Sequence, residues 1–256
     1  MARVHLFEFN DQSWLPDAWR RYITEYLQFM LEHGPFDELP TLIARTWDRE
    51  DDVGVVDLCS GSGGPWPAYL EGPLEQFENV DVLLTDLHPN PDTFRRIEER
   101  TEGRASGCDD PVDATDVPAR LEGPRTIING LHQFEPEQAR AILADAVDGG
   151  ERIGVFEIMD RRPITLLPLV LIPLFVLLLT PLVRPLRPGR FLWTYLLPVT
   201  PLLIFWDGLV SALRVYSPDE LRELVAELDD YDWDIGTVSA GKGPQRITYL
   251  IGKPDQ

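Results

Sequence analysis

The chain is poor in lysine. Only Lys242 and Lys253 occur among its 23 basic residues, against 43 acidic residues, and the formal net charge is −20. Nucleic-acid binding requires a basic surface against the phosphate backbone, so this deficit argues against nucleic acid as a partner. Dense negative charge with little lysine favours a salt-rich, halophilic cytoplasm, where counterions screen the repulsion between acids.

Cysteine and histidine are also scarce. The two cysteines, Cys59 and Cys108, are too few for a disulfide framework, and no CxxC pair indicates a zinc site. The four histidines lack the spacing of metal ligands, so we expect no metal. Acidic residues stand near the N-terminus where a secretion signal would need an apolar core. These absences predict a cytoplasmic protein.

The most informative stretch is residues 53–64, Val-Gly-Val-Val-Asp-Leu-Cys-Ser-Gly-Ser-Gly-Gly. A β-branched run ends at Asp57, and a glycine-rich turn and a segment that can start a helix follow. The glycines let a ligand approach the backbone closely and permit positive φ. A buried parallel strand that leads through such a turn into a helix is a common way to hold a nucleoside-bearing cofactor.

Strands and helices alternate along most of the chain. Apolar spacing and a capping box predict helices over 14–33, 36–47, 66–78, 136–147 and 217–228. Extended runs predict strands at 53–58, 80–86, 125–129, 152–158, 231–239 and 246–251. Gly72 and Pro73 should break the third helix. The order predicts an α/β fold, a doubly wound parallel sheet with helices on both faces and an antiparallel strand from the terminal hairpin.

Three acids are expected where strands end. In an open α/β sheet the ligand lies beyond the carboxyl ends of the strands. Asp86 comes 29 residues after Asp57, at the end of the next strand, where its carboxylate can accept both hydroxyls of a ribose. Asp113, beside the small Ala114, can accept a hydrogen bond from an adenine amino group. These acids predict a shared cofactor crevice.

The stretch Asp57-Leu-Cys-Ser-Gly61-Ser-Gly63 resembles motif I of class I S-adenosylmethionine-dependent methyltransferases. Asp86 matches the ribose-binding acid of that family, and Asp113-Ala114 resembles its adenine-binding pair. The segment Ile127–Phe134 resembles the one after the family's fourth strand, and the terminal hairpin is a family hallmark. Cys59 departs from the pattern, because the family usually has its first glycine there.

The resemblance covers roughly residues 50–160 and 208–252. It implies a Rossmann-like seven-stranded sheet whose seventh strand is antiparallel, and S-adenosyl-L-methionine as cofactor. The cofactor contacts are then expected from Asp57, Cys59, Gly61, Gly63, Asp86, Leu87, Asp113, Ala114, Asn129 and Gly130. A nicotinamide or flavin site is the rival, but its G-x-G-x-x-G pattern is replaced here by Gly-Ser-Gly-Gly-Pro at 61–65.

Methyl transfer needs a base only when the acceptor arrives protonated. His132 is the first candidate, because it follows the fourth strand near the expected methyl donor; the alternative is that it caps a helix or packs on the cofactor. Glu157 and Asp160 follow the fifth strand, where Glu157 is a second catalytic candidate and Asp160 can face the acceptor; the alternative is that they pair with Arg161 or Arg162. Asp11 and Trp14 are further acceptor candidates, because N-terminal segments often close the site in this family.

Residues 163–206 break the alternation. The first 21 residues of this segment carry no charge, and the segment has three arginines, no acid and eight prolines besides many aliphatic residues. We expect one domain over 1–256, with an N-terminal helical cap at 1–48 and an apolar helical insertion at 163–206. The insertion can form a lid over an apolar acceptor, a contact with the inner face of the membrane, or a homodimer interface. A hairpin that lies in the membrane interface fits its arginines better than two spans, which would place them outside.

Together these features predict S-adenosylmethionine-dependent methyl transfer to a small, apolar or lipid-like acceptor. The alternative is a non-catalytic, membrane-associated protein that retains the methyltransferase fold. In either case the chain is expected in the cytoplasm, with peripheral contact to the inner membrane face as one option for the insertion.

Overall fold

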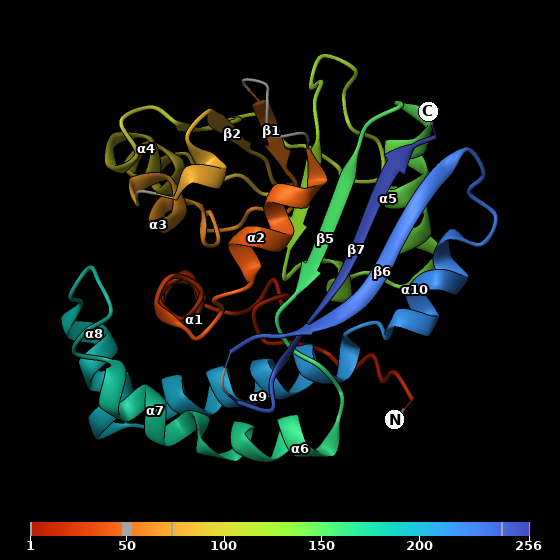
Figure 1. The fold of residues 1–256 in the computed structure, drawn as a ribbon. Coiled ribbons are helices and arrows are strands. Elements are labelled where there is room, and N and C mark those ends of the chain that lie inside the picture. The colour runs from red at the N-terminus through yellow and green to blue at the C-terminus, as the bar shows by residue number, and fades with distance from the viewer. Residues whose placement is uncertain (1, 48–52, 73, 242, 256) are drawn as a thin grey trace.

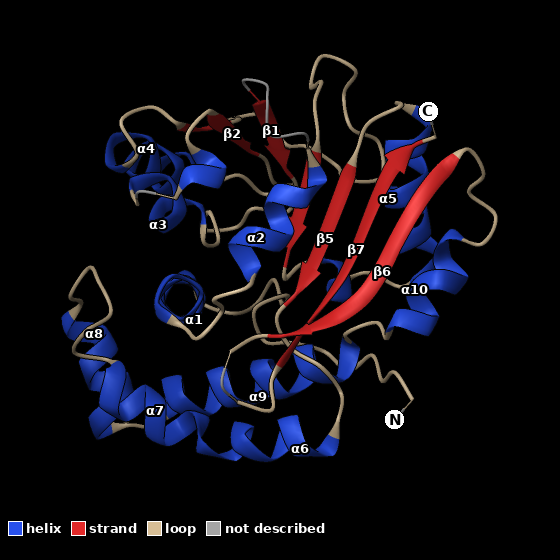
Figure 2. Ribbon diagram, viewed as in Figure 1, coloured by secondary structure: helices blue, strands red, loops and turns tan. Residues whose placement is uncertain are grey.

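A seven-stranded sheet lies at the centre of the fold, in the order β3-β2-β1-β4-β5-β7-β6 (Figures 1 and 2). The computed structural model describes residues 2–47, 53–72, 74–241 and 243–255. The strands are β1 Val53–Asp57, β2 Val80–Leu84, β3 Ala105–Gly107, β4 Arg125–Ile128, β5 Ile153–Glu157, β6 Tyr231–Ser239 and β7 Arg246–Pro254. The first five are parallel, and β7 runs antiparallel to both β5 and β6.

Helices cover both faces of the sheet. The helices are α1 Asp17–His33, α2 Leu39–Ile43, α3 Trp66–Glu71, α4 Pro91–Arg100, α5 Pro136–Asp148, α6 Pro163–Leu166, α7 Ile172–Leu179, α8 Pro188–Phe191, α9 Val199–Arg214 and α10 Pro218–Val225. Short 3₁₀ turns occur at Ala44–Thr46, Glu75–Phe77, Leu131–Gln133 and Leu167–Leu171, and a π-helical turn occurs at Leu192–Leu196.

The alternation of apolar side chains along each strand divides the core in two. On β1, Val55 packs with the side chains of α2, α3 and α4, whereas its neighbour Val56 packs with those of α5 and α10. Successive side chains of a strand point to opposite faces, so a buried strand supplies both layers. The predicted doubly wound sheet with an antiparallel terminal hairpin is confirmed, and the carboxyl ends of β1, β2 and β4 meet at one edge.

Several element boundaries differ from the predictions. The first helix begins at Asp17 and leaves Trp14 in a turn, because Pro16 precedes its first turn. The helix predicted over 36–47 is the short α2 and a 3₁₀ turn, and the helix predicted over 66–78 ends at Glu71, before Gly72. Helix α4 and strand β3 were missed.

The insertion forms a layer of its own below the sheet in Figure 1, made of α6 to α9. Helix α9 contacts both α7 and α1. None of the described helices is by itself both long and apolar enough to cross a membrane. Among the described helices, one pair, Pro188–Leu196 and Val199–Arg214, is long and apolar enough when taken together, but the two are bent by 83° at their junction.

Candidate active site

The glycine-rich turn after β1 is held from below by Asp57. The side chain of Asp57 is buried, and its carboxylate accepts hydrogen bonds from the hydroxyls of Ser60, at 2.6 Å, and Thr126, at 2.7 Å. Burial raises the pKa of Asp57 to about 6, although both hydroxyls act in the opposite direction. Since both carboxylate oxygens are engaged in the interior, Asp57 fixes the start of the turn.

The turn itself adopts left-handed conformations. Cys59 has φ 57°, which is costly for a residue with a side chain, and Gly61 and Gly63 have φ 54° and 85°. A Cβ added at Gly63 would lie 2.5 Å from Cδ1 of Ile97, so α4 packs directly against the turn. A Cβ added at Gly61 would meet nothing within 4 Å, so this side of the turn is open to a ligand.

Asp86 connects the end of β2 to the same turn. One oxygen of its carboxylate accepts the backbone N–H of Gly61 at 2.9 Å, and the other accepts that of His88 at 2.8 Å. Each carboxylate oxygen retains a lone pair for a further donor. The carboxylate is therefore held in place and can still accept hydroxyl groups.

Asp113 lies in the loop after β3, close to Asp86 in space. The backbone N–H of Val112 donates to the carbonyl of Asp86 at 2.9 Å. The Asp113 carboxylate accepts from the backbone and hydroxyl of Thr115, at 2.9 and 2.7 Å, and these bonds lower its pKa. Burial raises the pKa of the Cys59 thiol, and the carboxylates of all three acids raise it further. Asp57 and Asp86 thus both hold the turn that contains Cys59, and the loop that contains Asp113 is bonded to Asp86.

Asn129 and Gly130 form the other wall, after β4. A Cβ added at Gly130 would lie 3.5 Å from Cβ of Cys59, so the two turns are in contact. Asn129 adopts φ 54°, and its backbone N–H donates to the carbonyl of Phe156 at 2.7 Å. Its side-chain oxygen is buried and has no hydrogen-bond partner among the described residues. A buried, unpaired acceptor beside a ligand crevice fits a donor from the ligand.

His132 and Glu157 form a buried pair behind Asn129. The Glu157 carboxylate accepts the backbone N–H of His132 at 2.9 Å and lies 2.8 Å from its Nδ1. Because a carboxylate only accepts, Nδ1 carries the hydrogen and Nε2 keeps a lone pair. Burial acts to lower the pKa of His132, but Glu157 and then Glu8 outweigh it, and the net pKa is raised.

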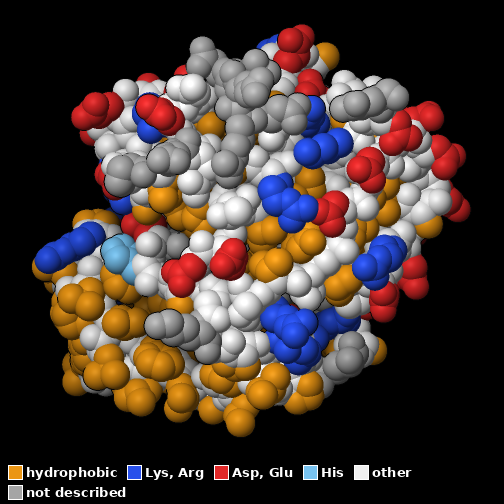
Figure 3. Space-filling model, in the orientation of Figure 1, with side chains coloured by type: hydrophobic (Ala, Val, Ile, Leu, Met, Phe, Trp, Pro, Cys, Tyr) orange, Lys and Arg blue, Asp and Glu red, His pale blue; other side chains and the backbone are white. Residues whose placement is uncertain are grey.

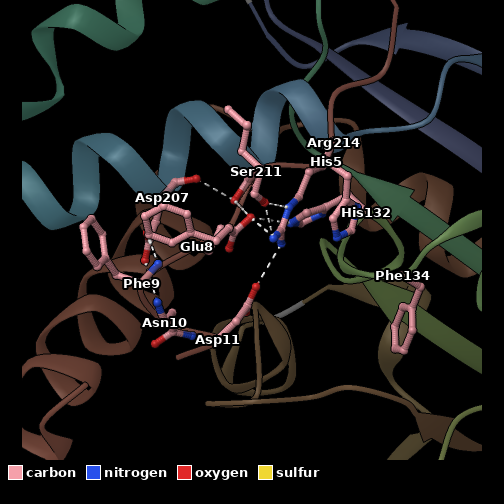
Figure 4. Close-up of polar contacts among 12 residues, drawn as sticks. His5, Glu8, Phe9, Asn10, Asp11, His132, Phe134, Asp207, Ser211 and Arg214 are labelled. Carbon is pink, nitrogen blue, oxygen red and sulfur yellow. Dashed lines mark hydrogen bonds and ion pairs between the residues drawn. The ribbon is translucent and has the colours of Figure 1, made fainter. Parts of the chain in front are cut away.

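Glu8 approaches His132 from the N-terminal segment (Figure 4). Its carboxylate lies 4.0 Å from Nε2 of His132 and 3.1 Å from the guanidinium of Arg214, and it accepts the hydroxyl of Ser211 at 2.9 Å. All four side chains are buried. Burial raises the pKa of Glu8, while His132 and Arg214 act to lower it. The cluster therefore places an acid on the Nε2 side of the histidine.

Helix α9 holds this N-terminal segment in place (Figure 4). Asp207 accepts the backbone N–H groups of Phe9 and Asn10 at 2.7 and 3.0 Å. The indole of Trp206 donates to the carbonyl of Phe7 at 2.9 Å, and Arg214 donates to the carbonyl of Leu6. Burial raises the pKa of Asp207 to about 6. The carboxylate of Asp207 thus serves as the hydrogen-bond acceptor that a backbone carbonyl would provide within a helix or a sheet.

A cavity of about 360 Å³ opens beside these residues. Its polar wall contains Asn129, His132 and Glu8, and its apolar wall comes from α1 and from the insertion. The apolar lining includes Ile23, Tyr26, Met30, Leu169, Ile172, Phe175 and Ile204. The cavity is therefore a mostly apolar chamber with one polar end, as expected of a small-molecule site.

The structure brings most of the predicted residues together, but not all. Ala114 is buried, whereas Leu87 is 51% exposed at the end of β2. Among the predicted acceptor residues, Asp160 lines the cavity, where it accepts from Arg162 and Thr165. Asp11 pairs with Arg214 at 3.0 Å, and Trp14 is 63% exposed and packs edge-on against Phe9; neither is part of the cavity lining.

Four residues of this site were missed in the sequence: Glu8, Asp207, Ser211 and Arg214. Three of them lie on α9, at positions 207, 211 and 214, whose spacing places them on one face of a helix. Polar residues at that spacing directly after an uncharged run were a usable signal. Glu8 had no such signal, because only the folded chain brings it to His132.

No protein-family model matches the sequence, and no curated protein matches it either. Solved structures do. The plantazolicin methyltransferase BpumL, in complex with SAH, has a TM-score of 0.58 and 13% identity, and the alignment covers 96% of this chain and 94% of that one.

Two O-methyltransferases are also similar in structure. NcsB1 from neocarzinostatin biosynthesis, in complex with S-adenosylmethionine and a naphthoic acid, has a TM-score of 0.52 and 16% identity over 94% of this chain. A family protein from Burkholderia thailandensis has a TM-score of 0.50 and 19% identity over 94% of this chain. The chain spans 57% and 59% of the lengths of these two proteins. The sheet order, the terminal hairpin and these neighbours show that the chain has the class I S-adenosylmethionine-dependent methyltransferase fold.

Proposed function

We propose that the protein transfers a methyl group from S-adenosylmethionine to a hydroxyl group of a small, mostly apolar acceptor. The observation that carries the proposal is the His132–Glu157 pair, whose histidine lies at the polar end of an apolar cavity. Asn129 lines the same cavity, and the adjoining Gly130 contacts Cys59 of the glycine-rich turn. The similar structures include an O-methyltransferase in complex with S-adenosylmethionine and a naphthoic acid, which supports the same class of reaction.

The crevice residues fit the cofactor. Asp86 retains lone pairs for the ribose hydroxyls, the turn at Gly61 is open, and Asn129 offers a buried acceptor without a partner among the described residues. Asp113 is at the position for the adenine amino group, and Asp57 acts by shaping the turn. When bound, the cofactor supplies an activated methyl group on a sulfonium.

His132 is the proposed base. Glu157 orients the ring and holds the hydrogen on Nδ1, so Nε2 is free to take the proton of an acceptor hydroxyl. Glu8, 4.0 Å from Nε2, stabilises the imidazolium that results. The apolar walls exclude water. They also hold the acceptor so that its oxygen is in line with the methyl group.

The acceptor is expected to be apolar with one polar end. The cavity joins a wall of Ile, Leu, Tyr and Phe side chains to the polar end at Asn129 and His132. Asp160 adds a second acceptor, which two neighbours already engage. A charged or extended polar acceptor would leave groups unpaired against the apolar wall.

The acidic composition bears on the salt concentration in which the protein acts. With a net charge of −20 and two lysines, the protein is proposed to act in a salt-rich cytoplasm. A non-catalytic, membrane-associated role is the second candidate, favoured by the exposed apolar side chains of the insertion. We prefer the enzyme, because an anchor has no need of a buried histidine–glutamate pair that faces a cavity.

Calorimetry with S-adenosylhomocysteine in high KCl tests the cofactor, and transfer of a labelled methyl group to hydroxylated aromatic and lipid acceptors tests the reaction. The variant His132→Asn should keep the product affinity and lose transfer by about 10²–10⁴-fold. A folded protein that binds NAD but gives no heat with S-adenosylhomocysteine would overturn the proposal. Transfer that His132→Asn leaves unchanged would overturn the role of the base.

A further inference from the structure

The outer side of the insertion presents a continuous face of hydrocarbon side chains. Figure 3 shows apolar side chains gathered along the edge of the molecule that carries α6 to α9. We call these residues the insertion face: Ile164, Leu167, Val170, Leu171, Leu174, Phe175, Leu178, Leu182, Leu186, Leu192, Tyr195, Leu196, Leu197 and Leu202. Each is at least 44% exposed, and Leu196 is 72% exposed. Soluble surfaces rarely gather so many large apolar residues.

The polar side chains of this segment point the other way. The segment has four threonines, and none of them is exposed. Thr180, Thr194 and Thr200 are buried, and Thr165 donates to the carbonyl of Arg162 at 2.7 Å. The hydroxyl of Thr180 donates to the carbonyl of Val176 at 2.6 Å, a bond within its own helix that removes a polar group from the outer surface. Polar groups inside and hydrocarbon outside is the arrangement expected of a surface that faces lipid.

The arginines follow the same rule. Arg187 and Arg190 both pair with Glu25 of α1, each at 2.7 Å, and Arg190 also donates to the carbonyls of Val183 and Pro185. These two cations therefore share one carboxylate on the protein side. Arg184 is exposed at the tip between α7 and α8, where a cation can reach lipid headgroups.

The inner side of the insertion is attached to the domain. Val176, Leu203 and Ile204 are buried in one cluster with Ile23 and Tyr26 of α1. The segment can therefore present only one side to a partner, as a helix layer that lies flat on a surface does.

We propose that the insertion face docks on the surface of a lipid bilayer, with its hydrocarbon side chains at the level of the upper acyl chains. A second copy of the chain is the competing occupant. Dimer interfaces carry about one hydrogen bond per 100–200 Å². The insertion face has a single side-chain polar group, the hydroxyl of Tyr195, which already donates to the carbonyl of Leu177 at 2.6 Å. A bilayer interior needs no such bonds.

The docking places the cavity next to the membrane. Leu169, Ile172 and Phe175 line the cavity from the same helices that carry the insertion face, and Phe175 belongs to both surfaces. An acceptor dissolved in the bilayer could then reach His132 along apolar side chains. This second step rests on the proposed methyl transfer; the docking itself does not.

Sedimentation of the full chain with vesicles tests the docking without any methyl donor. The vesicles are phosphatidylcholine alone, or phosphatidylcholine with phosphatidylglycerol. We expect binding to both at high KCl, and weaker binding to the anionic vesicles at low KCl because the protein is acidic. The single variants Leu167→Gln, Leu178→Gln and Leu196→Gln should each weaken binding, by about tenfold for a leucine that becomes fully buried.

The matched control is Leu87→Gln, the same change at a leucine 51% exposed outside the insertion, and it should bind as the wild type does. Equal binding of all four variants, or no binding of the wild type, overturns the proposal. Light scattering without lipid distinguishes the dimer: a stable dimer that Leu196→Gln dissociates, with no vesicle binding, assigns the face to a second copy. Vesicle binding without any heat from S-adenosylhomocysteine leaves the docking intact and removes the proposed methyl transfer.

Discussion

Nδ1 of His132 lies 2.8 Å from the carboxylate of Glu157, and both side chains are almost fully buried. The pair joins the turn after β4 to the end of β5, so two neighbouring strands position one imidazole. Burial alone would lower the pKa of His132, and the carboxylates of Glu157 and Glu8 reverse the shift. The folded protein therefore keeps the proton on His132 to a higher pH than the unfolded chain does.

The variant Glu157→Gln should lower the pKa of His132. Of the two carboxylates that raise this pKa, Glu157 has the greater effect, and the substitution removes its charge. Histidine resonances followed by NMR across pH measure this, and Glu8→Gln should have a smaller effect. A folded pKa above the unfolded one stabilises the protein below the unfolded pKa, and this stability is lost as pH rises through the folded pKa. In wild-type enzyme the transfer rate should rise with pH through the same value. An unchanged pKa in Glu157→Gln would contradict the pairing.

The variant Asp86→Asn should weaken binding of S-adenosylhomocysteine by about 1–3 kcal/mol, because an amide cannot accept at both of its atoms. The change conserves shape, and the amide oxygen can still accept the N–H of Gly61, whereas the N–H of His88 loses its acceptor. Titration calorimetry measures the affinity, and Asp92→Asn on the exposed surface of α4 is the control. If both variants bind equally well, the ribose lies elsewhere.

The strands and the glycine-rich turn were predictable because their signals are local. Val55 and Val56 alternate between two buried faces, and Asp57 ends the run. The parallel register then places Asp57 and Asp86 at one edge of the sheet. Strand β3 has only Ala, Ser and Gly, none of which favours a strand, and α4 buries only Phe94 and Ile97, so neither element had a clear pattern.

The acceptor side depended on distant contacts. Glu8 and Ser211 are 203 residues apart in sequence, yet their side chains are hydrogen-bonded. No local pattern predicts which acid of an acid-rich segment will reach α9, and Asp11 was chosen where Glu8 lies beside the histidine. The hydrophobicity of the insertion was evident from the sequence. The sequence does not show which of its side chains pack against α1 and which are exposed, because this depends on the folded structure.

The variant Asp207→Ala should loosen the N-terminal segment. It leaves the backbone N–H groups of Phe9 and Asn10 without their acceptor, which we expect to cost about 1–3 kcal/mol of unfolding free energy. Limited proteolysis should then cut within residues 2–12 faster than in wild type. The control Ser211→Ala removes one hydroxyl and should cost about 1 kcal/mol. Equal protection of the segment in Asp207→Ala would show that other contacts hold it.

The net charge of −20 predicts that salt stabilises the protein. Raising KCl from about 0.1 to 1 M shortens the screening length from about 10 to 3 Å, which weakens repulsion among exposed acids. The urea midpoint of unfolding should therefore rise with KCl. Sucrose of matched osmolality controls for effects that do not involve ions. A midpoint that KCl and sucrose raise equally would count against the electrostatic explanation.

Asp57 should make the protein less stable as pH rises from about 4 to 6. Its folded pKa of about 6 exceeds the ordinary value of 3.8, so the folded state holds a proton that the unfolded state has released. A shift of this size corresponds to about 2–3 kcal/mol, lost across that interval and constant above it. Urea unfolding at a series of pH values measures the slope, which Asp57→Asn should reduce and Asp92→Asn should not. Because Asp207 and Glu8 also have raised pKa values, part of the slope should remain in Asp57→Asn and become smaller still in the double variant with Asp207→Asn. A slope that Asp57→Asn leaves unchanged would mean that other groups carry the pH dependence.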